Sequence, residues 1–438
     1  MQEIKLPPLE RRLQKRYHKL VRSHMRSASP LVAGVTSLPD KGLAFAAVQG
    51  AWRFHNNEHV TLSALVQPLR DVGRDRLQNS TAGFALLVHD WSKLTYALGG
   101  KTDLTQLTHV HDVGYELTTA LLVNADDGSP LAPMEVHCRT GDGFLSTRPH
   151  ARIADHLGQV LPTMTASGTW GLSKPLLHVI DREADSVGHF RRWHRAGHKF
   201  LVRVDDRQVL WNETRCPLSD IRRTLGRGRH FCQAGGTGGV LYQGRTATLF
   251  VAETEVVLDR HAKKKIDGRS TAIAGVPLSL RLVLVQVRGE TGSILAEWVL
   301  LSNAPRSWAT TERLARSYYW RWRIESFFKL LKSHGHHLEQ WQQESGPAIA
   351  RRLLVAAMAC VVVWQLDHDD SAKAMEFKDA LVRLSGRQMK RTKRHTAPAL
   401  LAGLGVLLSM SALLQQIDIR KLTDFVAPLG FLAPQALV

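Results

Sequence analysis

The pattern of apolar and polar residues predicts a mixed α/β sheet in the first half of the chain. Apolar runs of strand length occupy residues 84–90, 94–99, 114–124, 175–185 and 199–206. The runs at 84–90 and 175–185 each end on acidic residues. Helical spacing appears at 150–160 and again, with basic residues, at 187–198. Strands interleaved with helices in this way are typical of a mixed α/β sheet.

The pattern changes after residue 230. Apolar and polar residues alternate with period two in 245–258 and 277–287, which predicts antiparallel strands, and a polar, basic turn is expected between them at 259–270. From about residue 311 onward the spacing is helical. A further helix is predicted at 9–26, directly after two prolines that a helix start tolerates.

Charge points to a polyanionic partner. The 438 residues are 44% hydrophobic, enough for substantial cores, and carry a formal net charge of +19. Nucleic acid is the first candidate and an anionic membrane surface the second. One face of the helix at 9–26 is either a solvated surface or a DNA-contacting arm, because it carries Arg11, Arg12, Lys15, Arg16, Lys19 and Arg22.

The apolar segment at 397–414 is long enough to cross a bilayer. It contains Pro398, two glycines and two serines, which favours a buried or dimer-interface helix over a membrane span. The first residues contain no apolar core of a signal peptide, and the four cysteines are scattered, which argues against structural zinc and a disulfide scaffold. We therefore expect a cytoplasmic protein that does not bind a membrane.

Two aspartates lie at the ends of apolar runs. Asp90 and Asp181 are expected at the ends of buried strands, either as solvated turn or cap residues or as ligands of a divalent ion. Carboxylates that share a core are costly unless a cation neutralises them. A third carboxylate would complete a two-metal site for phosphoryl transfer.

Glu325 is a candidate for that third carboxylate. If 318–332 is one helix, Glu325 shares a polar stripe with Tyr318, Arg321, Lys329 and Lys332. A surface ladder of ion pairs is the alternative, since Arg321 and Lys329 lie four residues on either side. Large aromatic residues flank the stripe, so the helix is expected to pack against a core and direct the stripe toward something specific.

These residues resemble a known family. The spacing of Tyr318, Arg321, Glu325 and Lys332 is similar to the Tyr-Arg-Glu-Lys signature of the insertion-sequence-four family of DDE transposases. DREAD at 181–185, GAWRFHNNEHV at 50–60 and EWVLLSN at 297–303 resemble further motifs of that family, in the same order. The resemblance covers about residues 45–370.

The resemblance implies a fold and a division of the chain. It implies a ribonuclease-H-like mixed sheet core, interrupted by an antiparallel β-rich insertion, with helical N- and C-terminal regions. The expected regions are a basic helical DNA-binding region at 1–75, the first part of the core at 76–206, the insertion at 207–303, the second part of the core at 304–370 and a C-terminal helical region at 371–438, which is a candidate for dimerisation.

The resemblance also implies a function, which is cut-and-paste transposition of DNA by two Mg²⁺ ions, for which Mn²⁺ can substitute. Asp90, Asp181 and Glu325 would be the catalytic metal ligands. Tyr318, Arg321 and Lys332 would contact DNA phosphates, with Lys329 as a helper by position. Trp298 would stack on a base flipped from the DNA end, or else be a core residue of a strand. The partners would be double-stranded DNA, as transposon ends and target, and a second copy of the chain in the DNA complex. The protein would be associated with the nucleoid in the cytoplasm.

Three other functions stay open at this point. A ribonuclease-H-like nuclease would cut without joining. An inactive or regulatory DNA-binding protein derived from a transposase would keep the fold without turnover, although its three acids are intact here. A peripheral membrane protein would use the basic surfaces and the segment at 397–414.

Overall fold

The computed structural model describes residues 4–26, 41–96, 100–151, 155–227, 231–234, 239–266, 269–389 and 394–421. The chain divides into two compact units. Unit 1 comprises Met1–Val60, Lys329–Glu344 and Arg351–Val438, and unit 2 comprises Thr61–Phe328 and Ser345–Ala350. This division follows packing and interleaves distant segments, so the expected division into five regions stays a prediction.

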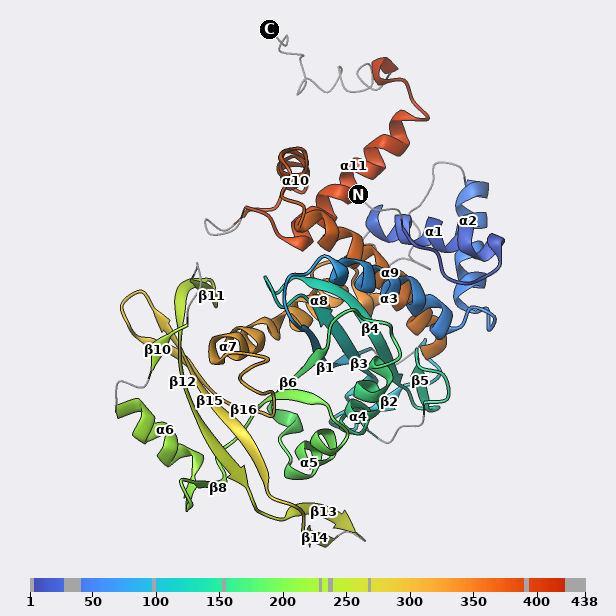
Figure 1. The fold of residues 1–438 in the computed structure, drawn as a ribbon. Coiled ribbons are helices and arrows are strands. Elements are labelled where there is room, and N and C mark those ends of the chain that lie inside the picture. The colour runs from blue at the N-terminus through green and yellow to red at the C-terminus, as the bar shows by residue number, and fades with distance from the viewer. Residues whose placement is uncertain are drawn as a thin grey trace. The chain divides into compact units, whose positions relative to one another are not determined.

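A mixed sheet forms the centre of unit 2 (Figure 1). Its first strands are β1 Ala85–Thr95, β2 Thr105–Gln106, β3 Val113–Val123, β4 Pro130–Arg139, β5 Phe144–Ser146, β6 Leu176–Ile180 and β7 Lys199–Arg203. β1 is antiparallel to β3 and parallel to β6, and β6 is parallel to β7. The last four residues of β6 are all buried, which explains its continuous apolar sequence. The mixed α/β prediction is confirmed.

The same sheet continues through the period-two block. Its strands are β8 Gln208–Trp211, β9 Thr214–Pro217, β10 Cys232–Gln233, β11 Val240–Tyr242, β12 Arg245–Leu258, β15 Leu278–Gly289 and β16 Ile294–Ser302. β12 pairs antiparallel with β15, β15 with β16, and β16 with β7. The two halves therefore form a single sheet, which has 14 strands among the described residues. The predicted antiparallel strands are confirmed.

Three local predictions are wrong. β1 runs unbroken to Thr95, because its backbone stays paired with β3 from Leu86 onward, so 84–90 and 94–99 are not separate strands; residues 97–99 lie outside the described residues. The expected turn at 259–270 contains instead the paired strands β13 Ala262–Ile266 and β14 Arg269–Ile273. The segment 318–332 is two helices, as described below.

Helices cover this sheet. They are α3 Leu62–Gln78, α4 His156–Ser167, α5 Val187–Arg195, α6 Leu218–Arg227 and α7 Thr311–Trp320. α3 packs on β4, α5 on β7, α6 on β8 and β9, and α7 on β12 and β15. Figure 1 shows β12, β15 and β16 as long neighbouring strands with α7 beside them. α7 begins where the Thr310 side chain accepts a hydrogen bond from the Arg313 backbone N–H, a common helix cap.

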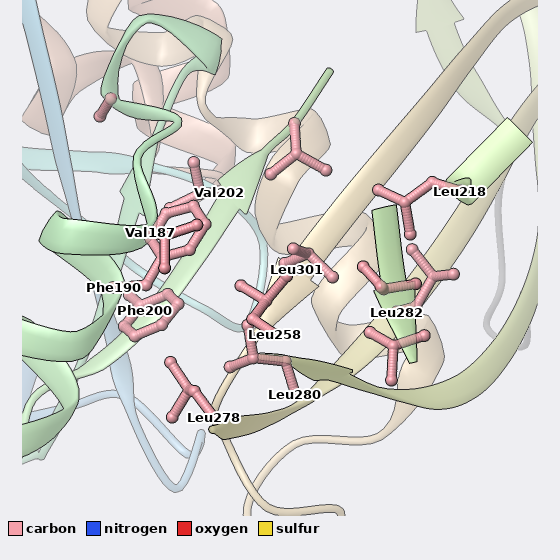
Figure 2. Packing of buried hydrophobic residues seen from close by; sticks show 14 of the residues in the cluster. Val187, Phe190, Phe200, Val202, Leu218, Leu258, Leu278, Leu280, Leu282 and Leu301 are labelled. Atoms are coloured by element: carbon pink, nitrogen blue, oxygen red, sulfur yellow. The ribbon is translucent and has the colours of Figure 1, made fainter. Parts of the chain in front are cut away.

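An apolar core joins α5 and β7 to the long strands. Phe190 of α5 and Phe200 of β7 stack with ring centroids 5.3 Å apart, and Trp193 packs edge-on against Phe200. Leucines of β12 and β15, among them Leu258 and Leu280, close the cluster from the other side (Figure 2). This packing fixes β7 and β16 beside β6, the strand that leads into Asp181.

Unit 1 is helical in its described residues. It contains α1 Arg11–Arg26, α2 Lys41–His55, α10 Ala372–Leu384, α11 Ala397–Leu414 and most of α9 Gly346–Asp367. α1 buries Tyr17, Leu20 and Val21, while Arg11, Arg12 and Lys15 are exposed, as its amphipathic sequence predicts. α11 packs against α1 and α10, and a Cβ added at Gly403 would lie 1.9 Å from the backbone oxygen of Leu381.

Two described helices are long and apolar enough to cross a membrane by length and composition. The most apolar window of α9 is 89% buried, as in the core helices of soluble proteins, and that of α11 is 28% buried. Such helices are weak support for a membrane span. Part of the apolar surface of α11 is exposed, including Met410 and Leu413. The role of α11 as a dimer helix stays a prediction.

Candidate active site

Strand register brings Asp90 and Asp181 to the same level of the sheet. His89 of β1 pairs with Ile180 of β6, and each aspartate is the next residue along its strand direction. β1 continues past Asp90, whereas β6 ends at Ile180. Asp181 then caps a short 3-10 helix at Arg182–Ala184 and accepts a hydrogen bond of 2.7 Å from the Arg182 backbone N–H. Asp90, in the middle of β1, and Asp181, just after the end of β6, therefore lie at the same level of two neighbouring parallel strands.

Glu325 reaches the same place from a helix. The segment 318–332 is interrupted at Arg321, where α7 ends and α8 Trp322–Lys332 begins. The Arg321 backbone N–H donates to Tyr318 O at 3.1 Å, and Ile324 N–H donates to Arg321 O at 3.2 Å, so tight three-residue turns replace α-helical bonds there. Glu325 lies in the first turn of α8.

A single guanidinium contacts all three acids. Arg321 Nη1 lies 3.3 Å from Asp90 Oδ2, and Arg321 Nη2 lies 3.5 Å from Asp181 Oδ2 and 2.6 Å from Glu325 Oε1. The Arg321 side chain is 5% exposed. Three carboxylates that are distant in the sequence thus surround one buried positive charge, and this cluster is hereafter called the acid cluster.

The aromatic residues beside the acid cluster are buried. The Tyr318 hydroxyl donates to Asp181 Oδ1 at 2.9 Å, and the Tyr318 ring lies edge-on to Trp298, with centroids 5.2 Å apart. Trp298 is 4% exposed in β16. A base could stack on its ring only after a local movement, so the base-stacking role of Trp298 stays a prediction.

Burial and charge set the proton affinities in the acid cluster. Burial raises the pKa of Asp90 to about 6 against the opposing charge of Arg321. Burial also acts to raise the pKa of Asp181, but Arg321, the Arg182 N–H and the Tyr318 hydroxyl together lower it. Burial would lower the pKa of Arg321, yet Asp181 and its other anionic neighbours raise it overall. Arg321 therefore stays charged, and the pKa of Asp90 lies closer to neutral pH than that of Asp181.

A second polar network lies next to the acid cluster, and sequence reasoning missed most of it. His156 bridges two acids, with Nδ1 3.1 Å from Glu116 Oε1 and Nε2 3.2 Å from Glu183 Oε1. Trp91 donates to Glu183 Oε2 at 2.8 Å and stacks on His156. Glu183 belongs to the DREAD segment at 181–185, but no role was predicted for it. No local signal marks Glu116 or His156, because strand pairing and helix packing bring them there.

The two lysines of the expected stripe belong to unit 1. Lys329 is exposed, and Lys332 Nζ lies 3.0 Å from Glu339 Oε1 of the same unit. Because the helix is interrupted at Arg321, the prediction that the stripe lies on a single regular helix is wrong. The contacts of Tyr318, Arg321 and Glu325 come from two consecutive helices.

The donor chemistry of the acid cluster fits a divalent ion. Carboxylate oxygens are the ligands that Mg²⁺ prefers, and here three of them surround a cationic centre. In the described part of the chain, no three His, Cys, Asp or Glu side chains lie close enough together to hold one ion as they stand. The guanidinium of Arg321 lies between the three acids, so metal binding there requires Arg321 to move.

Comparison with known proteins gives one family match. Residues 154–362, just under half of the chain, match the family model of the transposase DDE domain, and this range includes Asp181, Arg321 and Glu325. No curated protein sequence matches the chain. The piggyBac transposase, solved by cryo-electron microscopy as a synaptic complex with hairpin DNA, aligns over 94% of this chain and 74% of its own at 10% identity.

The TM-score of that alignment is 0.39, too low to carry an argument about fold or function. The Tyr-Arg-Glu-Lys signature of the insertion-sequence-four family stays a prediction. Residues 154–362 are therefore similar to the transposase DDE domain.

Proposed function

We propose that this protein is a cut-and-paste DNA transposase that binds the terminal inverted repeats of its insertion sequence, cleaves DNA there and joins the freed 3′ end to a target. The observation that supports this proposal most is the acid cluster, in which Asp90, Asp181 and Glu325 surround one guanidinium. The match of residues 154–362 to the transposase DDE domain supports the reaction class.

In this proposal Asp90, Asp181 and Glu325 hold two Mg²⁺ ions. When bound, the ions would supply positive charge that stabilises the negative charge on the attacking and leaving oxygens of an in-line displacement at phosphorus. The Tyr318 hydroxyl, which donates to Asp181, orients that carboxylate and keeps one of its oxygens occupied. No side chain has to form a covalent intermediate with the DNA.

The remaining groups bind and position DNA. Tyr318, Arg321 and Lys332 contact phosphates near the cleaved end, and Lys329 assists them. Trp298 stacks on a base flipped from the DNA end once a local movement has exposed its ring. The exposed basic face of α1 contributes sequence-independent attraction to the duplex. DNA binding by such charges weakens as salt concentration rises, because bound counterions are released.

We extend the proposal to the organisation of the chain. Residues 76–206 and 304–370 form a ribonuclease-H-like core, residues 207–303 are its β-rich insertion, residues 1–75 bind DNA and residues 371–438 contribute to a homodimer. The protein acts on chromosomal DNA in the cytoplasm. An inactive, regulatory DNA-binding protein is the alternative, and the guanidinium between the three acids is the observation that favours it.

The test is cleavage of a duplex that carries the ends flanking the native gene, in the presence of Mg²⁺. Glu325→Gln should bind this duplex as tightly as the unmodified protein and should fail to nick it. Glu312→Gln, the same chemical change in the first turn of α7, should cleave normally. Normal cleavage by Glu325→Gln would remove Glu325 from the reaction. Binding without cleavage by the unmodified protein would favour the inactive alternative.

A further inference from the structure

The guanidinium of Arg321 lies at the centre of the acid cluster and holds its three carboxylates together. The proposed reaction does not require an arginine at that position. Three carboxylates that lie this close repel one another unless a cation is shared among them. Among the described residues, the cation that contacts all three is the buried guanidinium of Arg321, at 2.6 to 3.5 Å. Without it, the middle of β1, the end of β6 and the start of α8 would carry uncompensated negative charge.

The guanidinium is not fully satisfied in this position. Arg321 Nε is buried and has no hydrogen-bond partner in the described structure, although both Nη atoms are used. A buried donor without a partner costs free energy. The position of Arg321 is therefore stabilised mainly by its ion pairs with the three carboxylates. A cation of higher charge at the same centre would neutralise these carboxylates in its place, and Arg321 would lose that stabilisation.

Arg321 lies beside two aromatic rings that differ in exposure. Its guanidinium lies 5.8 Å from the ring centroid of Tyr318 and 5.8 Å from that of Trp322. Tyr318 is 1% exposed, whereas Trp322 is 38% exposed. A turn of the side chain along the Trp322 ring leads outward and keeps a favourable cation–π contact. The residue stands at the junction of α7 and α8, outside a regular helical turn.

We propose that Arg321 is an internal counter-cation that holds Asp90, Asp181 and Glu325 together before metal binds, and that metal ions displace it outward along Trp322, where it contacts a DNA phosphate. This inference rests on the proposed function, since it takes the acid cluster to be the metal site. Arg321 is then a positioning residue while no metal is bound, and it contacts DNA once the metal ions are bound. Metal loading and phosphate binding by Arg321 are then coupled.

The test measures Mn²⁺ binding directly, by the electron paramagnetic resonance signal of free Mn²⁺ in titrations of the full chain without DNA. Arg321→Gln removes the competing charge and should bind Mn²⁺ about tenfold more tightly, a size typical of coupling between two sites. The same variant should melt at a lower temperature than the unmodified protein without metal and recover when Mn²⁺ is added, because the acids then regain a counter-ion.

Two further variants make the result specific. Arg323→Gln removes a positive charge two residues away from Arg321. Arg323 Nε donates a hydrogen bond to Gly128 O and contacts none of the three acids in the described structure, so this variant should leave the Mn²⁺ affinity unchanged. Arg321→Lys keeps the charge on a single ammonium that cannot bridge three acids, so its Mn²⁺ affinity should exceed that of the unmodified protein. If Arg321→Gln does not fold, the Arg321→Lys result decides.

The two proposals fail in different ways. Mn²⁺ affinity of Arg321→Gln and Arg321→Lys at or below that of the unmodified protein overturns the counter-cation role. If Asp181→Asn at the same time loses Mn²⁺ binding, the metal site and the proposed function stand. If Asp181→Asn binds Mn²⁺ as well as the unmodified protein, the acid cluster is not the metal site, and both the metal assignment and this inference fall.

Discussion

A buried ion network between the long strands and α7 offers a sharp test of how this fold positions the acid cluster. Arg281 of β15 donates to both oxygens of Glu253 on β12, at 3.1 and 2.6 Å, and to the backbone oxygens of Ala304 and Ala309 at 3.0 and 2.7 Å. Glu253 also accepts from Thr311, the first residue of α7, at 2.6 Å. The network thus fixes the start of the helix that ends at Arg321.

The perturbation is Arg281→Met, which keeps the length of the side chain and removes its charge and donors. The Arg281 and Glu253 side chains are 7% and 6% exposed, so the variant leaves a buried carboxylate and two carbonyl oxygens without their main donor. Breaking such a pair from one side typically costs about 3–5 kcal/mol. We expect a loss of that size in the free energy of unfolding.

A control comes from the same carboxylate. Arg306 also contacts Glu253, at 2.6 Å, but its side chain is 63% exposed. Arg306→Met should cost at most about 1 kcal/mol, as exposed ion pairs do. The double variant Arg281→Met with Glu253→Met should recover most of the loss, because replacing both buried charges removes the unpaired one.

The assay is urea denaturation at pH 7, followed by circular dichroism, with the slope of the transition compared between variants. Equal losses for Arg281→Met and Arg306→Met would refute the reasoning, because burial would then not determine the cost. A loss below about 1 kcal/mol for Arg281→Met would refute it as well, since the network would then contribute no more than an exposed pair.

The remaining predictions concern His156 and α11. Burial would lower the pKa of His156, but Glu116 and Glu183 raise this pKa overall. The ion pairs of His156 therefore contribute their full stability below the pKa that His156 has in the unfolded chain. This contribution is lost as the pH rises through the higher pKa of the folded state. The stability difference between the unmodified protein and His156→Gln should therefore shrink above about pH 6.5, and a difference that grows with pH would contradict this. For α11, Met410→Glu combined with Leu413→Glu should reduce a dimer to a monomer in light scattering after size-exclusion chromatography, because both side chains are exposed. A retained dimer mass would rule out this face.

The sequence by itself determined the character of individual elements. Continuous apolar runs marked β6 and most of β1 as buried strands. They correctly placed Asp181 directly after a strand, but the expectation that Asp90 ends a strand is wrong, because β1 continues past it to Thr95. Period-two alternation marked β12, and helical spacing marked α1. Each of these follows from which faces of one element are buried, and that information is local.

Tertiary structure alone decided which elements meet. The pairing of β16 with β7, the parallel register of β1 with β6 and the approach of His156 to Glu183 all join segments whose local patterns carry no information about their partners. The position of Arg321 belongs here too. Its spacing suggested a place on a regular helical stripe, but the shared attraction of three carboxylates and the break between α7 and α8 bring it to their centre. Electrostatic balance in a buried site depends on every charge that the fold assembles there, and one stretch of sequence contains only some of them.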